Sequence, residues 1–326
     1  MRVDELRTVL DKYDAATLKE IVVALYKKIP KTRKEDDDLD ELLSNFSREK
    51  TKVVKKERSV DFDDLSTEIV QFLDYADKQY YFGPNKYVRK DQRSKWRFAV
   101  KRFIKDLLIV SGEDSEEAAG LLADIYDMLS YACNYYIFST ENPFSSVGYQ
   151  QTDLLQIVLG KIFYSGFSLH AIKMAVFLTL DSNVDRETLH EELLVTLINM
   201  LKTTDTKEEA LAQCLAYQQE YSAYQGAKRL FKYSNDNYRP KEHKNYAVEL
   251  YFMLKLSLYE YDDAIEYFWK NHTSYKDKEI TLYCLLEFLD NYDLNDLWIR
   301  EYEKALTNGI QPRENLQRKY HDRKAD

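Results

Sequence analysis

Glycine and proline are both scarce in this chain of 326 residues, which contains eight glycines and five prolines. In an average chain the two together make up about 12% of the residues. Because glycine and proline are the residues that most often interrupt helices and strands, their scarcity predicts helices joined by short connections. The prolines fall between segments of periodic apolar residues, at Pro30, Pro84, Pro143, Pro240 and Pro312.

The few glycines also argue against the common nucleotide-binding loops. Such loops need closely spaced glycines so that backbone amides can approach a phosphate. The glycines here are never closer than six positions apart. Gly160 and Gly166 miss the P-loop spacing by one residue, and Phe167 stands where that loop needs a lysine. The sequence therefore predicts no nucleotide site of these types.

Cysteine and histidine, the usual ligands of zinc, are rare as well. Cys133, Cys214 and Cys284 lie far apart inside apolar patterns, which indicates buried thiols in a reducing cytosol rather than disulfides. None of the five histidines has a second histidine four residues away, as a helical zinc site requires. His170 lies within an apolar run and is interpreted as a hydrogen-bonded core residue. We expect no metal and no cofactor.

The sequence shows no signature of a catalytic site. A cysteine–histidine pair could assemble from distant positions, but no local motif supports one. Pairs of carboxylates such as Asp262 and Asp263 are expected by chance among 56 acidic residues. An enzyme with a site assembled from scattered residues stays open as an alternative. The N-terminal residues form no apolar signal segment, so a cytoplasmic location is expected.

The longest apolar stretch runs from Leu154 to Leu180 and contains only two charged residues, Lys161 and Lys173. About 20 apolar residues suffice to cross a bilayer, so a membrane span is one interpretation. The two lysines and the break around Gly166 favour two short buried helices instead. Ser168 is the expected N-cap of the second helix. We therefore expect a core element and no membrane contact.

Charge is distributed unevenly along the chain, whose net charge is −9. This negative charge disfavours indiscriminate nucleic-acid binding.

Residues 1–46 are predicted to form a small N-terminal helical unit. Its first part resembles the nucleic-acid-binding SAP-type helix-extended-helix module, without the glycine and lysine usual between the helices. Residues 47–60 form a basic linker or interaction arm.

A central helical body is predicted over residues 61–204, and its most regular helix covers residues 91–110. Four cations follow one another at steps of four along this helix, so they should share one ridge: Arg93, Arg97, Lys101 and Lys105. Like charges so placed repel one another, so an anionic partner is expected nearby. That partner could be acidic residues 61–64 or 114–117, solvent ions, an external phosphate or an acidic protein. Internal pairing or solvation is the favoured interpretation.

Residues 205–312 contain an internal repeat. Residues 221–233 align with residues 259–271, and a further step of 34 carries Ala264 to Trp298 and Phe268 to Tyr302. This period resembles the tetratricopeptide repeat, although that family's glycine and closing proline are missing. HEAT-like or irregular helix pairs stay open. The resemblance implies a curved stack of helix pairs that holds a peptide or another protein. Residues 313–326 are expected to form a polar tail that frays.

Tyrosine is abundant, with 27 residues in the chain. Tyrosine combines a large apolar ring with a polar tip and is enriched at protein interfaces. Half-buried core packing is the favoured interpretation, and a binding groove that includes Tyr251, Tyr259 and Tyr267 is the functional one.

Together these patterns predict an all-α protein, a multi-helical array of antiparallel helix pairs that is α-solenoid-like and has a small N-terminal helical unit. The expected function is non-catalytic binding of another protein or a peptide, as a scaffold or adaptor. The alternative is a nucleic-acid-associated protein that uses the basic segments 47–60 and 86–105. The anion-binding candidates in both cases are Arg93, Arg97, Lys101 and Lys105.

Overall fold

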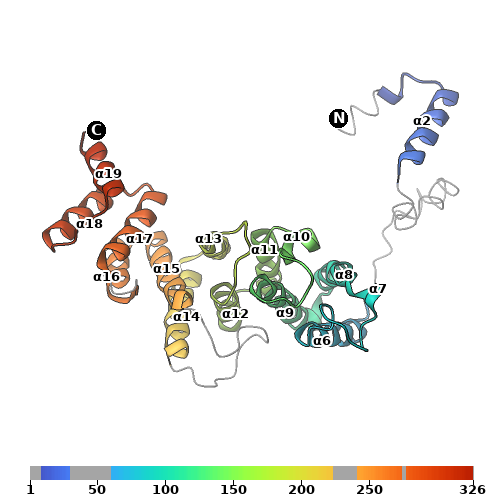
Figure 1. Cartoon of the computed structure of the whole chain (residues 1–326), viewed down its shortest axis with the longest axis horizontal. Helices are drawn as coiled ribbons and strands as arrows, with labels where there is room; N and C mark the ends of the chain where they lie inside the picture. Colours follow the sequence, from blue (N-terminus) through green and yellow to red (C-terminus); the bar gives the residue numbers. More distant parts are fainter. Residues whose placement is uncertain (1–8, 30–59, 223–240, 274–276, 326) are drawn as a thin grey trace. The chain divides into compact units, whose positions relative to one another are not determined.

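The computed structural model describes residues 9–29, 60–222, 241–273 and 277–325, and every regular element in these ranges is a helix (Figure 1). The all-α prediction is therefore confirmed. The chain divides into two units, residues 1–59 and residues 60–326. The basic linker expected at residues 47–60 lies outside the described ranges except for its last residue.

The first unit contains helix α2 (Ala15–Lys28). Asp14 caps it, because its Oδ1 accepts a hydrogen bond from the backbone N–H of Thr17 at 2.8 Å. No residue of α2 is buried within the described part of the chain. Val9 and Leu10 are also helical, and residues 1–8 and 30–46 of the expected helical unit lie outside the described ranges.

The second unit begins with helices that pack around α9 (Ser115–Asn134). Helices α6 (Phe62–Asp77) and α8 (Trp96–Ile109) pack on α9, and the 3₁₀ helix η1 (Gly112–Asp114) directly precedes α9 in the chain. The apolar faces of these helices are buried, since Ile69 of α6 and Val100 of α8 are fully enclosed.

The single helix expected over residues 91–110 is divided in two. A short helix α7 (Lys90–Arg93) precedes α8, and Ser94 and Lys95 lie between them. The Arg93 side chain donates hydrogen bonds to the backbone oxygens of Val88 at 3.2 Å and Asn85 at 3.4 Å. These bonds tie α7 to the preceding loop.

The apolar stretch of residues 154–180 forms two buried helices, as predicted. They are α11 (Gln151–Ile162) and α12 (Leu169–Leu180), and the short helix α10 (Pro143–Val147) precedes them. Ser168 caps α12 by accepting a hydrogen bond from the N–H of Ala171 at 3.1 Å. No helix in the described ranges is long and apolar enough to cross a membrane.

The prediction for His170 was wrong, because its side chain is exposed. His170 lies in the first turn of α12, and burial of that helix begins only at Ala171. An apolar run in sequence therefore does not bury every residue at its ends.

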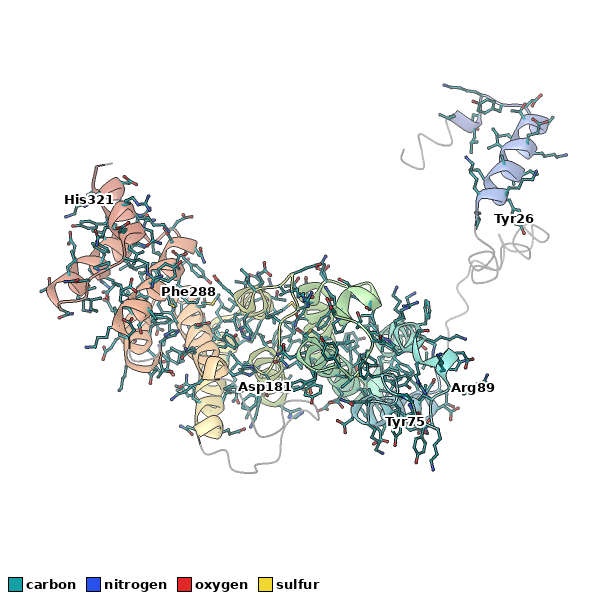
Figure 2. All side chains as sticks on the ribbon, viewed as in Figure 1. Tyr26, Tyr75, Arg89, Asp181, Phe288 and His321 are labelled. Carbon is teal, nitrogen blue, oxygen red and sulfur yellow. The ribbon has the colours of Figure 1, made fainter. Side chains whose placement is uncertain are left out.

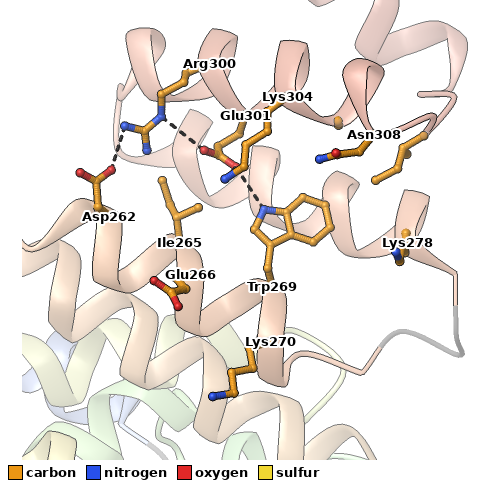
Figure 3. Close-up of a pocket in the computed structure, with 12 residues that line it drawn as sticks. Asp262, Ile265, Glu266, Trp269, Lys270, Lys278, Arg300, Glu301, Lys304 and Asn308 are labelled. Atoms are coloured by element: carbon orange, nitrogen blue, oxygen red, sulfur yellow. Dashed lines mark hydrogen bonds and ion pairs between the residues drawn. The ribbon is translucent and has the colours of Figure 1, made fainter.

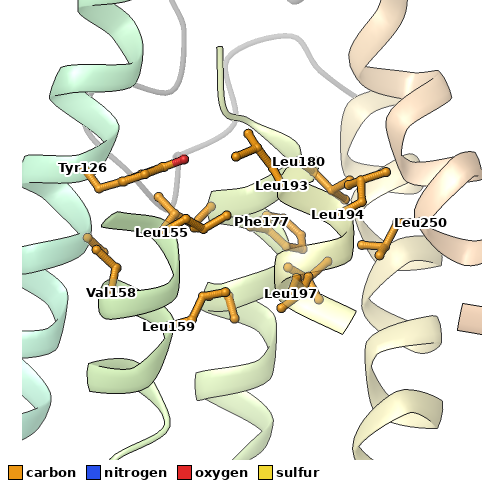
Figure 4. Packing of buried hydrophobic residues seen from close by; sticks show 14 of the residues in the cluster. Tyr126, Leu155, Val158, Leu159, Phe177, Leu180, Leu193, Leu194, Leu197 and Leu250 are labelled. Atoms are coloured by element: carbon orange, nitrogen blue, oxygen red, sulfur yellow. The ribbon is translucent and has the colours of Figure 1, made fainter. Parts of the chain in front are cut away.

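The core of the second unit joins the faces of α9, α11, α12 and α13 (His190–Met200) (Figure 4). Its side chains interlock across the helices, and the side chains of the whole unit fill the spaces between elements (Figure 2). The labelled examples include Tyr126, Leu155, Val158, Leu159, Phe177, Leu180, Leu193, Leu194 and Leu197.

From residue 204 onward the described ranges contain six helices, and each packs on the next. They are α14 (Thr204–Ser222), α15 (Lys241–Ser257), α16 (Tyr261–Asn271), α17 (Lys278–Asn291), α18 (Asn295–Thr307) and α19 (Glu314–Ala325). The repeated positions Ala264, Phe268, Trp298 and Tyr302 are all buried. The earlier copy of the repeat, at residues 221–233, falls largely outside the described ranges.

The turns inside the pairs α15–α16 and α17–α18 have the same geometry. Tyr259 has φ +63° and Asp293, 34 positions later, has φ +54°. In each turn the N–H that follows this residue bonds to a carbonyl five positions earlier, from Glu260 to Lys255 at 3.0 Å and from Leu294 to Leu289 at 2.9 Å. This is the hydrogen bond of a Schellman motif, which ends a helix with a left-handed residue.

The polar tail does not fray as expected. Residues 314–325 form α19, and its residue Leu316 is fully buried. The Nζ of Lys319 lies 2.6 Å from the Oδ2 of Asp290 on α17, and Arg323 also contacts that carboxylate. These long-range contacts stabilise a helix that is polar on its own.

Candidate functional site

A groove lies between α16 and α18 and has a volume of about 950 Å³ (Figure 3). We call it the α16–α18 groove. Its apolar lining comes from Ile265 and Trp269 on α16, Ala305 on α18, and Ile310 beyond α18. None of these residues is among the candidates predicted from the sequence.

Glu301 organises one wall of the groove, although only 1% of this residue is exposed. Its Oε2 accepts a hydrogen bond from the indole Nε1 of Trp269 at 3.1 Å and lies 3.6 Å from the Nζ of Lys304. Its Oε1 accepts from the Nε of Arg300 at 3.3 Å (Figure 3). Burying a carboxylate is costly unless it is paired and hydrogen-bonded, so these donors offset the burial of Glu301, and the bond from Trp269 fixes the indole ring.

The rim of the groove is charged and faces solvent. Arg300 bridges to the opposite wall, where its Nη1 lies 2.8 Å from the Oδ1 of Asp262. Lys270 and Lys278 also line the rim, and neither makes an ion pair within the described ranges. The side chains of Lys304 and Asp262 are 60% and 83% exposed, so the groove is open to a large ligand.

The three tyrosines expected to share a groove separate into two places. The rings of Tyr251 and Tyr267 stack with centroids 3.8 Å apart, and the Tyr267 hydroxyl donates to the Oε1 of Gln218 at 2.9 Å. Burial raises the pKa of Tyr267 to about 12. Tyr259 stands apart in the turn after α15, with 79% of the residue exposed.

The four cations expected to share a ridge also separate. Arg93 belongs to α7 and is occupied by backbone oxygens, whereas Arg97, Lys101 and Lys105 remain on one side of α8. None of the four makes an ion pair with a residue that the structure describes. Glu68 of α6 reaches α8 and pairs with Arg102, which lies outside the predicted ridge.

The side chains with metal-binding or nucleophilic chemistry are not arranged for it in the described part of the chain. No group of three or more histidine, cysteine, aspartate or glutamate side chains there could hold a metal ion. Burial raises the pKa of Cys133 to about 12 and that of Cys284 to about 11, and it also raises the pKa of Cys214. A protonated thiol is a poor nucleophile.

One signal in the sequence could have identified the groove. Glu301 lies between Trp298 and Tyr302, so a charged residue interrupts the apolar stripe of α18. Such a residue must find partners on a neighbouring element when it is buried, but its partner Trp269 is 32 positions away and cannot be chosen from sequence.

The chain was compared with protein-family models, with curated proteins and with solved structures, and none of the three comparisons finds a match. Functional conclusions therefore rest on the geometry of these surfaces.

Proposed function

We propose that this chain is a non-catalytic scaffold or adaptor that binds a segment of another protein in the α16–α18 groove. The observation that carries the proposal is the groove itself, an open site of about 950 Å³ with an apolar floor and a charged rim. Apolar anchors in a pocket surrounded by polar groups are what a protein-binding site needs.

The rigid setting of Trp269 supports this proposal. Aromatic side chains are frequent anchors of binding energy at interfaces, and the hydrogen bond to Glu301 holds this ring without any ligand. A side chain that is already ordered loses little conformational entropy on binding. Lys270 and Lys278 can then pair with acidic groups of the bound segment.

The 34-residue register of the two helix pairs supports a tetratricopeptide-like assignment over a HEAT-like one. HEAT and armadillo repeats have periods of about 40–47 residues, whereas tetratricopeptide repeats have 34. We infer that residues 241–307 are two such units, which in that architecture would present their helices to a bound peptide.

Site-specific photo-crosslinking in the cells that make this protein tests the proposal. A benzoylphenylalanine placed at Lys270 should crosslink to a discrete protein, and the same group at Gln156, which is exposed on α11, should not. Trp269→Ala in the Lys270 variant should reduce the crosslinked product at least tenfold. Equal crosslinking from both positions, or none from Lys270, would contradict the proposal.

A further inference from the structure

A second surface with a different chemistry lies on α8. We name it the α8 basic face and define it by Arg97, Phe98, Lys101 and Lys105. We propose that the α8 basic face binds single-stranded nucleic acid through its phosphates and bases. This site is separate from the α16–α18 groove and does not depend on the function proposed for that groove.

Positive charge is concentrated around α8. Residues 86–105 contain nine lysines and arginines and one acidic residue, Asp91, in a chain whose net charge is −9. At about 0.1 M salt, charges more than about 10 Å apart are largely screened from each other. A phosphate chain near α8 therefore experiences mainly the local positive charge.

Few of these cations pair with acidic residues that the structure describes. Arg102 pairs with Glu68 and lies 3.8 Å from Asp106, and Arg89 lies 3.2 Å from Asp91. The three cations of the α8 basic face have no such partner among the residues that the structure describes. Neighbouring like charges on a helix repel each other, so an anionic ligand would relieve that repulsion.

Exposed aromatic rings lie among these cations. Phe98 is 58% exposed, and the Arg97 guanidinium lies 5.1 Å from its ring centroid. In the loop before α7, Tyr87 is 53% exposed and stacks on Tyr80 with centroids 4.5 Å apart. The Nζ of Lys86 lies 5.5 Å from the Tyr87 ring.

These rings favour a single strand over the other anionic partners. Proteins that bind single strands combine a positive track for the backbone with aromatic rings on which bases stack. Bases in a duplex are stacked inside it and cannot reach such rings, and an acidic protein does not need them. Cations four residues apart on a helix are separated by about 6 Å along its axis. The exposed Arg97 and Lys105 can therefore meet separate phosphates of an extended strand, and Lys101, which is half-buried with its amine beside Gly148, lies between them.

Fluorescence anisotropy of a labelled 20-nucleotide oligothymidine with the full chain tests this inference. Arg97→Glu/Lys101→Glu should weaken binding at least tenfold at about 50 mM salt. The matched control is Lys202→Glu/Arg318→Glu, which changes the net charge equally at exposed positions of α19 and of the segment before α14 and should leave the affinity unchanged. For three phosphate contacts, the logarithm of the wild-type binding constant should fall with the logarithm of salt with a slope of about −2.

Phe98→Ala separates stacking from charge, and a loss of about tenfold in affinity is expected because each base–aromatic stack contributes substantially to binding. Circular dichroism of each variant confirms that the helices are intact. Equal loss in both charge variants would overturn the inference, because the effect would then be one of net charge. Polyglutamate that competes as well as the oligonucleotide would also overturn it and indicate an acidic protein partner.

Discussion

At the scale of single residues, His190 shows how burial sets the charge of a side chain. It lies at the start of α13, and its ring stacks on Tyr246 of α15 with centroids 3.4 Å apart. Burial, together with charge repulsion from the nearby His243, lowers the pKa of His190 to about 3. The unfolded chain has a histidine pKa of about 6.5, so only the unfolded state binds this proton between these two values.

His190→Phe should therefore reduce the acid sensitivity of the fold while keeping an aromatic ring against Tyr246. Wild-type protein should lose roughly 1 kcal/mol of stability per pH unit from this residue as the pH falls below 6.5. Urea unfolding at pH 7 and pH 5 measures the difference in the free energy of unfolding. The exposed residue His170 provides the control, because His170→Phe should keep the wild-type dependence. The same dependence in His190→Phe as in wild type would contradict this account.

At the scale of elements, the turns of the two C-terminal helix pairs are built on residues other than glycine. Tyr259 has a left-handed backbone and is mostly exposed, so little of its side chain is stabilised by contacts. For a residue with a β-carbon, this conformation costs about 1–2 kcal/mol of conformational free energy. The Schellman geometry of the turn therefore costs free energy at this position.

Tyr259→Gly should raise the free energy of unfolding by about 1 kcal/mol, because the relief of backbone strain exceeds the added entropy of the unfolded chain. Thermal or urea unfolding measures this change. Asp293→Gly at the matching position should give a smaller gain, because aspartate tolerates the left-handed region better than tyrosine does. A clear loss of stability in Tyr259→Gly would mean that its side-chain contacts matter more than the strain.

Most elements could be predicted from their local patterns, and the exceptions have a common cause. The apolar stripes of α6, α8 and α9 were visible as repeats of three and four, because one face of each helix is buried. The break before α8 and the formation of α19 were not visible. Both involve side chains that bond outside their own helix, since Arg93 bonds to the backbone of Asn85 eight positions earlier and Lys319 pairs with Asp290 on α17.

At the scale of the whole molecule, the C-terminal helices of the second unit pack mainly on their neighbours in the chain. In such arrays stability is approximately a sum of local terms, and regions can open separately. Leu316 of α19 is fully buried at the end of the chain, so it reports on the last elements alone.

Leu316→Ala should remove about 2–5 kcal/mol of local stability, as is usual for a buried leucine. Amide hydrogen exchange should then become faster in α17, α18 and α19 and stay unchanged in α9, α11 and α12. Leu306→Ala provides a control on α18, because that side chain is exposed and its loss should change little. An equal increase in exchange across all these helices would show that the second unit unfolds as one cooperative body.

The sequence by itself determined the helical class, the buried faces and the concentration of positive charge in residues 86–105, because helix periodicity and composition are local properties. Only the tertiary structure decided which side chains meet. It separated Tyr259 from Tyr251 and Tyr267, exposed His170, and joined Trp269 to Glu301 across two helices. Residues so far apart in the chain meet because of how the helices pack on one another, and the local sequence pattern does not determine that packing.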